Sequence, residues 1–279
     1  MTNSELKNLL DERVLLYNNK SFIETDPIQI PKKFGQKENI EISGFMAATI
    51  AWGQRPTIIR NAMQLVELME NNPIEFLLNT RENDWLRFEQ FKHRTFNGTD
   101  CICFLRSLKN IYMNHGGLEA VFRKGYQEEK SIASSLRYFR EIFFEVAHER
   151  RSQKHVPNID NGAAAKRINM FLRWMVRKDK SGVDFGLWKD IPMSALKIPL
   201  DVHAGTQARL LGLLTRTQND WKAVEELTAR LTTFDPHDPV KYDFALFGMG
   251  VNEKSNKPAR ATGKTKDEKK SEGECERKV

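Results

Sequence analysis

The chain has 279 residues, of which 40% are hydrophobic, so it can bury the core of one large or two modest domains. No apolar run approaches the ~20 residues that a membrane span needs, and the charged, amphipathic start does not resemble a secretory signal. We therefore expect a cytoplasmic protein that does not contact a membrane. Of the three cysteines, Cys101 and Cys103 stand too close together to form a useful bridge, which excludes a disulfide framework. No Cys or His cluster suits a metal, so we expect no metal and no cofactor.

The net charge is +7, from 44 Lys and Arg against 37 Asp and Glu, and it permits a polyanionic partner without requiring one. Residues 253–279 hold nine basic and six acidic side chains, so they carry +3 and leave +4 for the rest. This segment has almost nothing apolar to bury, and we expect a disordered, charged tail. A solubilising extension fits its composition better than a dedicated nucleic-acid arm.

Apolar residues recur at steps of three and four along most of the remaining chain, which predicts an all-α fold. Prolines fall between the periodic segments, where helix boundaries are expected. No alternating pattern indicates a strand. The segments with helical periodicity are 42–53, 56–71, 104–115, 131–150, 162–179, 204–214 and 220–234.

The polar cluster "FKHRTFNGTDC", residues 91–101, lies between two of these segments. We predict a loop whose turn is made by Asn97 and Gly98, with Thr99 or Asp100 capping the next helix. The other interpretation is that His93 and Arg94, which stand in this same stretch, offer ligands for a phosphate or a base edge.

The next segment to carry functional signals is the helix over 162–179. At 100° per residue its polar face holds Lys166, Arg173 and Arg177, and residues 166–180 carry a local charge of +5. Most such charge runs are solvated helix faces. Trp174 in the same helix, and the short connection to the next motif, favour a site nearby instead.

That next motif, "IPLDVHAGTQARLLGLL", sets Asp201 and His203 just after a proline-marked break and at the start of a helical pattern. An aspartate in this place accepts bonds from free N–H groups of the first turn, which contributes ~1 kcal/mol. A carboxylate fixed there can also steady positive charge or take a proton. Asp201 is therefore predicted either as a cap alone or as a cap that is also catalytic.

The same motif, followed by "AVEELTARL" and "YDFALFGMGVN", resembles the catalytic segment of the helix-hairpin-helix (HhH-GPD) DNA glycosylases. Upstream, "FMAATIAWGQRPTIIRNAMQLVE" is similar to the early helix pair of that superfamily, with Gln54 at the turn. Between them, "AAAKRINMFLRWM" resembles the lysine-bearing helix of the archaeal 8-oxoguanine glycosylase branch. The resemblance covers residues 41–252. As a whole the chain is most similar to a bacterial family that carries only a domain-of-unknown-function label and is a remote relative of these enzymes.

The chain departs from the superfamily at its hairpin. The usual Leu-Pro-Gly-Val-Gly run with a lysine after it is absent, and "WKDIPMSALKIP" stands in its place. Phosphate anchoring by the hairpin backbone is therefore not implied. The nucleophile stays open among Lys166, which fits the archaeal pattern, and Lys189 and Lys197, which are nearer to Asp201 in sequence.

The resemblance implies a two-lobed helical fold. Residues 1–35 would pack back on the C-terminal lobe, residues 36–195 would form one helical lobe, and residues 196–252 would form the C-terminal lobe with the aspartate motif. The tail, residues 253–279, would follow.

The activity that it implies is excision of a flipped damaged base, with an oxidised purine as the candidate lesion and lyase activity as a possible second step. Lys166 would attack the sugar, Asp201 would assist, and Gln54 would fill the gap in the duplex, while Trp52, Trp174 or Phe96 would stack on the base. The expected partner is duplex DNA, bound by a monomer that would associate with the nucleoid. The residues expected to bind substrate or DNA are Gln54, Trp52, Arg55, His93, Arg94, Arg167, Arg173, Trp174, His203 and Arg209. The alternatives are a non-catalytic nucleic-acid-binding descendant and a helical interaction protein in which Lys166 and Asp201 form a structural ion pair.

Overall fold

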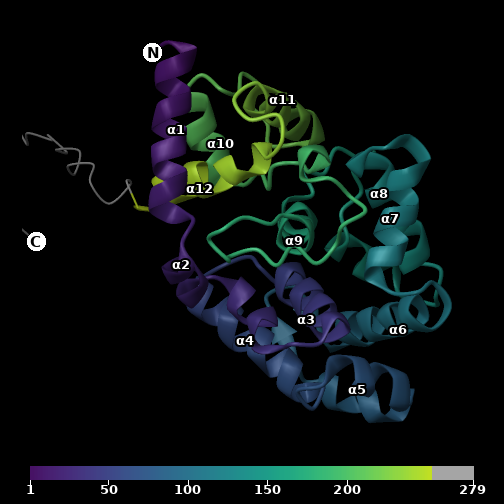
Figure 1. Cartoon of the computed structure of the whole chain (residues 1–279). Coiled ribbons are helices and arrows are strands. Elements are labelled where there is room, and N and C mark those ends of the chain that lie inside the picture. The colour runs from purple at the N-terminus through teal and green to yellow at the C-terminus, as the bar shows by residue number, and fades with distance from the viewer. Residues whose placement is uncertain (253–279) are drawn as a thin grey trace, which may run out of the picture.

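The computed structural model describes residues 1–252 and shows a chain built almost wholly of helices (Figure 1). The α-helices are α1 (Asn3–Tyr17), α2 (Lys20–Thr25), α3 (Lys37–Thr49), α4 (Arg55–Leu68), α5 (Pro73–Asn79), α6 (Gly98–Asn114), α7 (Leu118–Glu129), α8 (Ile132–Phe143), α9 (Lys166–Val176), α10 (Val202–Leu210), α11 (Trp221–Thr232) and α12 (Tyr242–Asn252). Short 3₁₀ turns are η1 (Pro27–Gln29), η2 (Pro31–Lys33), η3 (Glu82–Phe88), η4 (Arg150–His155), η5 (Met193–Ala195) and η6 (Pro239–Lys241). The predicted all-α class is confirmed. The predicted disordered tail, residues 253–279, lies outside the described residues.

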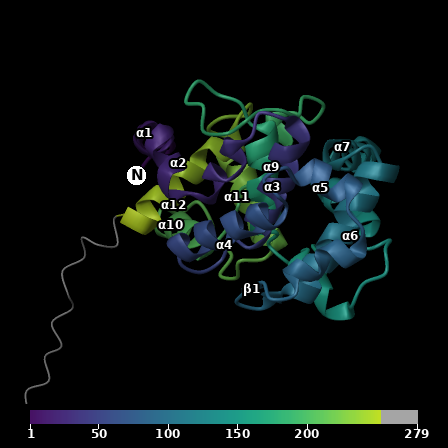
Figure 2. The same cartoon turned by 90° about the horizontal axis from the view of Figure 1, so that it is seen from below.

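Helix α9 is the centre of the molecule. It packs against α3, and the two views place it between the group formed by α1, α10, α11 and α12 and the group formed by α6, α7 and α8 (Figures 1 and 2). Every residue from Ile168 to Val176 is buried. The sequence predicted one apolar face on this helix, whereas in the structure neighbouring elements cover the helix on all sides.

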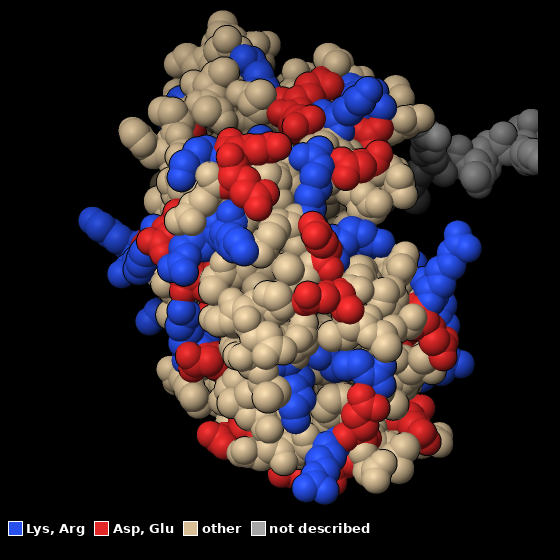
Figure 3. Space-filling model, turned by 90° about the vertical axis from the view of Figure 1, so that its right-hand side faces the viewer, with Lys and Arg blue, Asp and Glu red and all other residues tan. Residues whose placement is uncertain are grey.

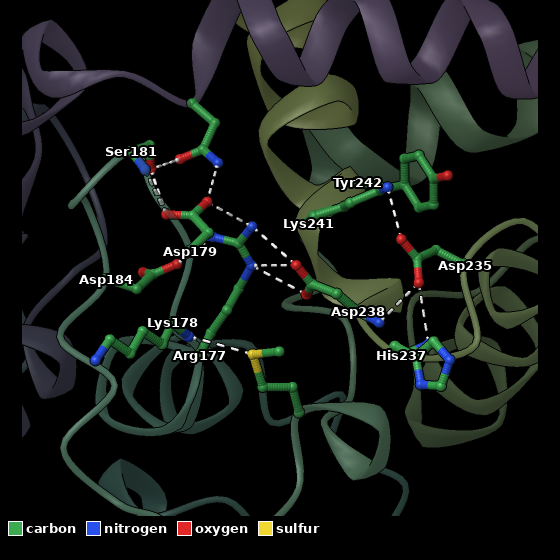
Figure 4. A network of polar contacts seen from close by, with 12 residues as sticks. Arg177, Lys178, Asp179, Ser181, Asp184, Asp235, His237, Asp238, Lys241 and Tyr242 are labelled. Carbon is green, nitrogen blue, oxygen red and sulfur yellow. Dashed lines mark hydrogen bonds and ion pairs between the residues drawn. The ribbon is translucent and has the colours of Figure 1, made fainter.

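Burial of α9 excludes a solvated basic face at Arg173 and Arg177, and it corrects the prediction that Arg173 binds substrate or DNA. Arg173 is 2% exposed and Arg177 is 1% exposed. Arg173 pairs with Asp184, at 3.2 Å, and with Asp243, while Arg177 bonds Asp184 at 2.9 Å. Figure 4 shows that the Arg177 guanidinium is held by several acidic side chains, with further bonds to Asp179 and Asp238. Buried arginines need such partners because an unpaired buried charge is costly, so these two hold elements together and do not face a ligand.

The termini of the described chain meet. Helix α1 packs along α12, and α10 packs on α12 from another side (Figure 1). Buried apolar residues from Leu6 to Met249 belong to one continuous core. The lobe boundaries predicted at residues 35 and 195, and the glycosylase type of the fold, stay predictions.

A short β-hairpin was not predicted. Strand β1 (Lys92–His93) pairs with β2 (Phe96–Asn97), and the turn between them is made at Arg94, whose φ of 55° is left-handed. The expected turn at Asn97 and Gly98 is therefore wrong. Asn97 instead caps α6 and exchanges bonds with Asp100, as a capping box does. Two-residue strands are too short to show an alternating pattern in sequence.

The surface that carries α7 and α8 mixes both charge signs. In Figure 3 the Lys and Arg side chains there are interspersed with Asp and Glu, without a broad patch of one sign. Long-range attraction of DNA to this face would be weak, so any nucleic-acid site must be sought elsewhere.

No helix in residues 1–252 combines the length and apolarity needed to span a bilayer.

Candidate functional site

A cavity of about 700 Å³ opens where six parts of the chain converge. Its walls come from the start of η1, the loop between α3 and α4 with the first turn of α4, the first turns of α9, the start of α10, the loop before α11 and the end of α12. Its volume lies within the ~300–1,000 Å³ of typical small-molecule sites. The cavity is lined by Asp26, Pro27, Ala51, Trp52, Gly53, Arg55, Ile58, Lys166, Arg167, Met170, Leu200, Asp201, Val202, His203, Asn219, Phe247, Gly250 and Val251.

Lys166 and Asp201, the two residues predicted to be catalytic, both line this cavity. The distance from Lys166 Nζ to Asp201 Oδ2 is 3.9 Å, and the two side chains are 26% and 22% exposed. Lys166 is the first residue of α9, and the left-handed Ala165 before it turns the chain sharply into the helix. The Lys166 ammonium also lies 3.7 Å from the sulfur of Met170. An amine and a carboxylate are thus presented to one space by two helix starts.

Asp201 is also a helix cap. Its Oδ1 accepts a bond from the Ala204 N–H at 2.9 Å, and its extended backbone is typical of an N-cap. The Asn219 amide donates to the Asp201 carbonyl at 3.1 Å. Oδ1 therefore fixes the side chain through the cap, while Oδ2 points toward Lys166. Capping and a chemical role are thus compatible.

Trp52 and Arg167 form one wall. The guanidinium carbon of Arg167 lies 4.6 Å from the centre of the Trp52 ring, and Arg167 donates to the Thr49 carbonyl. Burial lowers the pKa of Arg167 to about 10. His93 supports this wall from behind, because its Nε2 bonds the Trp52 carbonyl at 3.0 Å and its Nδ1 bonds Asn61 at 3.0 Å. With both ring nitrogens used and only 1% exposure, His93 orients Trp52 and is not available to a phosphate or base.

Arg55, His203 and Phe247 form another part of the lining. The Arg55 guanidinium carbon lies 4.7 Å from the Phe247 ring centre, and the His203 ring meets the same phenyl edge-on at 6.2 Å. Gly250 allows α12 to approach α10, because a Cβ there would lie 2.9 Å from that of His203. Two aromatic residues, Phe247 and Trp52, therefore line the cavity along with Lys166 and Asp201.

Asp26 was missed by sequence reasoning. It lines the cavity, is 6% exposed and caps η1 by accepting the Ile28 N–H at 3.1 Å. Its run, "TDPIQIP", reads only as a capped turn. Nothing local places it opposite Lys166, which is 140 positions away in the chain. Asn219 and Phe247 were also not singled out as site residues.

The other predicted site residues are divided between the core and the rim. Trp174 and Phe96 are each 0% exposed and lie in the core, where neither can stack on a base. Arg209 bonds the Arg216 carbonyl and Asn219, so it fixes the loop that follows α10. Gln54 and Arg94 are exposed.

Gln54 and Arg94 stand at the rim beside Gly53. Gly53 has a φ of 111°, and a Cβ there would lie 3.2 Å from the Arg94 guanidinium, which packs over it. Gln54 follows Gly53 and precedes α4, and its side chain makes no capping bond. The hairpin turn and the α3–α4 loop therefore join into one rim, with one exposed cation and one exposed amide.

Of the three candidate nucleophiles, Lys166 lines the cavity and the other two do not. Lys189 is exposed and bonds the Gly186 carbonyl. Lys197 stands in the connection before Asp201, outside the lining. A second hollow of about 800 Å³, floored by Ile30, Ile59 and Met63, shares Arg55 with this cavity but includes neither Lys166 nor Asp201.

A match to a protein-family model over most of the chain shows which family the chain belongs to. Residues 26–252 match the model of the family described as protein of unknown function (DUF2400). The chain belongs to this family. The DUF2400 match includes Asp26, Lys166 and Asp201, so the whole cavity lies within it. No curated protein and no solved structure matches the chain.

Proposed function

We propose that this DUF2400 protein is a DNA glycosylase that removes a flipped base and uses Lys166 as an amine nucleophile. The observation that carries the proposal is that Lys166 and Asp201 face each other at 3.9 Å in one cavity of about 700 Å³. A nucleophile within reach of a base, with an aromatic wall beside them, is the arrangement that attack on a nucleotide sugar needs. The resemblance of both segments to glycosylase motifs adds support.

The reaction uses the two side chains in sequence. The Lys166 amine bonds to the sugar C1′, and the bond from C1′ to the base nitrogen breaks with its electron pair leaving on the base. Before the attack, the Lys166 ammonium loses one proton to solvent, and Asp201 stays a carboxylate whose charge offsets the positive charge that develops on the sugar. Once the bond to C1′ has formed, Asp201 Oδ2 takes the proton that the attached nitrogen sheds. The sugar ring then opens: the bond between C1′ and the ring oxygen breaks, the proton held by Asp201 passes to that oxygen, and a Schiff base forms between Lys166 and C1′, from which lyase cleavage of the strand can proceed.

In this proposal the walls of the cavity hold the flipped nucleotide. Extruding a base costs a few kcal/mol of lost stacking, which a new aromatic partner offsets in part. Trp52 lines the cavity in a fixed orientation, because Arg167 lies over its ring and His93 bonds its carbonyl. In this proposal Gln54 on the rim enters the gap left in the duplex, and Arg94 beside it meets a phosphate.

Two observations favour a second reading, in which the protein binds nucleic acid or a helical partner without catalysis. Asp201 caps α10, and its distance to Lys166 also fits an ordinary ion pair. Both contacts would exist in a protein without a substrate. The two readings differ in whether the Lys166 amine ever forms a covalent bond.

Borohydride reduction tests this difference, because it converts a Schiff base into a stable crosslink. The purified full chain is incubated with duplexes carrying 8-oxoguanine, hypoxanthine, uracil or a preformed abasic site. The wild type and the control Lys189→Gln are expected to be trapped on the abasic strand, and Lys166→Gln is not. Trapping of Lys166→Gln at the wild-type level would move the nucleophile elsewhere. No base release and no trapping by the wild type would leave only the non-catalytic reading.

A further inference from the structure

Asp26 is the one deeply buried carboxyl group that lines the cavity. Its Oδ1 is occupied by the Ile28 N–H, whereas no hydrogen bond within residues 1–252 involves its Oδ2. Asp26 is 6% exposed as a whole, and its Oδ2 is not among the fully buried atoms without a partner in residues 1–252. Because Asp26 lines the cavity, we take its Oδ2 to be reached from the cavity, where a bound ligand could meet it.

The surroundings decide which form of the carboxyl group is stable. Burial raises the pKa of Asp26, and the bond from the Ile28 N–H together with the positive charges of Arg173, Arg55 and Lys166 lower it by less. The neutral acid is therefore favoured over a wider pH range than for an exposed aspartate. In that form the proton belongs on Oδ2, because Oδ1 is accepting a bond.

Asp201 differs from Asp26 in each respect. It is 22% exposed on its side chain, its Oδ2 faces an ammonium group, and it stands at the start of a nine-residue helix, where negative charge is stabilised. Two carboxyl groups in one cavity with such different surroundings are suited to different roles, one as acid and the other as base.

We propose that Asp26 is the general acid that protonates the departing base. The inference rests on the proposed glycosylase function and adds the group that this function lacks. When Lys166 nitrogen bonds to C1′, the base leaves with the electron pair of the broken bond, and a neutral base would depart as an anion. The Asp26 Oδ2 proton transfers to the base, which leaves as a neutral molecule, and Asp26 regains a proton from water once the site opens. Asp201 takes the proton shed by the lysine nitrogen, so both protons are accounted for.

The role predicts that Asp26 matters only while a base is leaving. Asp26→Asn keeps an oxygen for the Ile28 N–H, so the fold should be retained, but an amide has no acidic proton to give. General acid catalysis contributes ~10²–10⁴-fold to rate. We expect single-turnover release of a base from the duplex panel to fall by about 10²-fold or more in Asp26→Asn. Trapping on a preformed abasic site, from which no base departs, should proceed at the wild-type rate.

A matched control is Asp220→Asn, because Asp220 also caps a helix, α11, by accepting the Ala223 N–H at 3.0 Å but lies outside the cavity. This control should release the base at the wild-type rate.

Base release by Asp26→Asn at the wild-type rate would overturn the proposal. Equal losses of base release and of abasic trapping in Asp26→Asn would also overturn the proposal, since they would show a structural role. A wild type that is trapped on abasic strands but releases no base would overturn it as well. Absence of any wild-type trapping would instead contradict the proposed function itself.

Discussion

Replacing Asp201 separates its two possible roles, because they respond to different substitutions. Its Oδ1 caps α10 and its Oδ2 faces Lys166. Asp201→Asn keeps the cap and loses only a partly exposed ion pair, which contributes ~0–1 kcal/mol. Asp201→Ala loses both, so about 1–2 kcal/mol of stability should disappear, or about 2–4 °C in Tm for each kcal/mol.

The effect on catalysis should be much larger than the effect on stability. A carboxylate that takes a proton or offsets sugar charge contributes ~10²–10⁴-fold, equal to about 3–5 kcal/mol of barrier. Domains are stable by ~5–15 kcal/mol, so a loss of about 1 kcal/mol leaves nearly every molecule folded. The assay pairs thermal unfolding with single-turnover base release for wild type, Asp201→Asn and Asp201→Ala. An Asn variant that is as stable and as active as wild type would refute the catalytic role and leave Asp201 as a cap.

Three other properties can be checked. Gln54→Ala should impair base release from duplex more than from single-stranded DNA, because a gap opens only in a duplex; equal losses would make it an ordinary turn residue. Arg94→Ala should reduce the salt dependence of duplex binding by about one counterion, and an unchanged slope would remove Arg94 from the interface. Burial raises the pKa of Asp243 to about 6, so its contribution to stability is present at low pH and is lost as the pH rises from about 4 to about 6. Unfolding across that range should show a loss of roughly 1–3 kcal/mol in the wild type that is smaller in Asp243→Asn.

The helices could be predicted because the signal is local. Apolar spacing and capping residues act within one or two turns, and the all-α class followed from them. The cap at Asp201 was likewise readable from a few neighbouring residues. The resemblance to glycosylase segments added Lys166, which periodicity alone shows only as one cation on a polar face.

The burial of Arg173 and Arg177 on α9 could not be predicted from the sequence, and the reason is physical. The acidic partners of Arg173 and Arg177 stand up to 70 positions away in the chain, so a helical wheel shows the charges and not their partners. Asp26 presents the same difficulty, because a capped turn near the N-terminal end of the chain shows nothing of the cavity that α9 and α10 complete. The β-hairpin had too few residues for any periodicity.

The identity of the lysine that becomes covalently attached is the most direct test of the proposed chemistry. Wild-type protein trapped by borohydride on an abasic duplex can be digested and the modified peptide sequenced by mass spectrometry. The geometry predicts the adduct on Lys166, the lysine 3.9 Å from Asp201. An adduct on Lys189 or Lys197, or no adduct on any lysine, would contradict it.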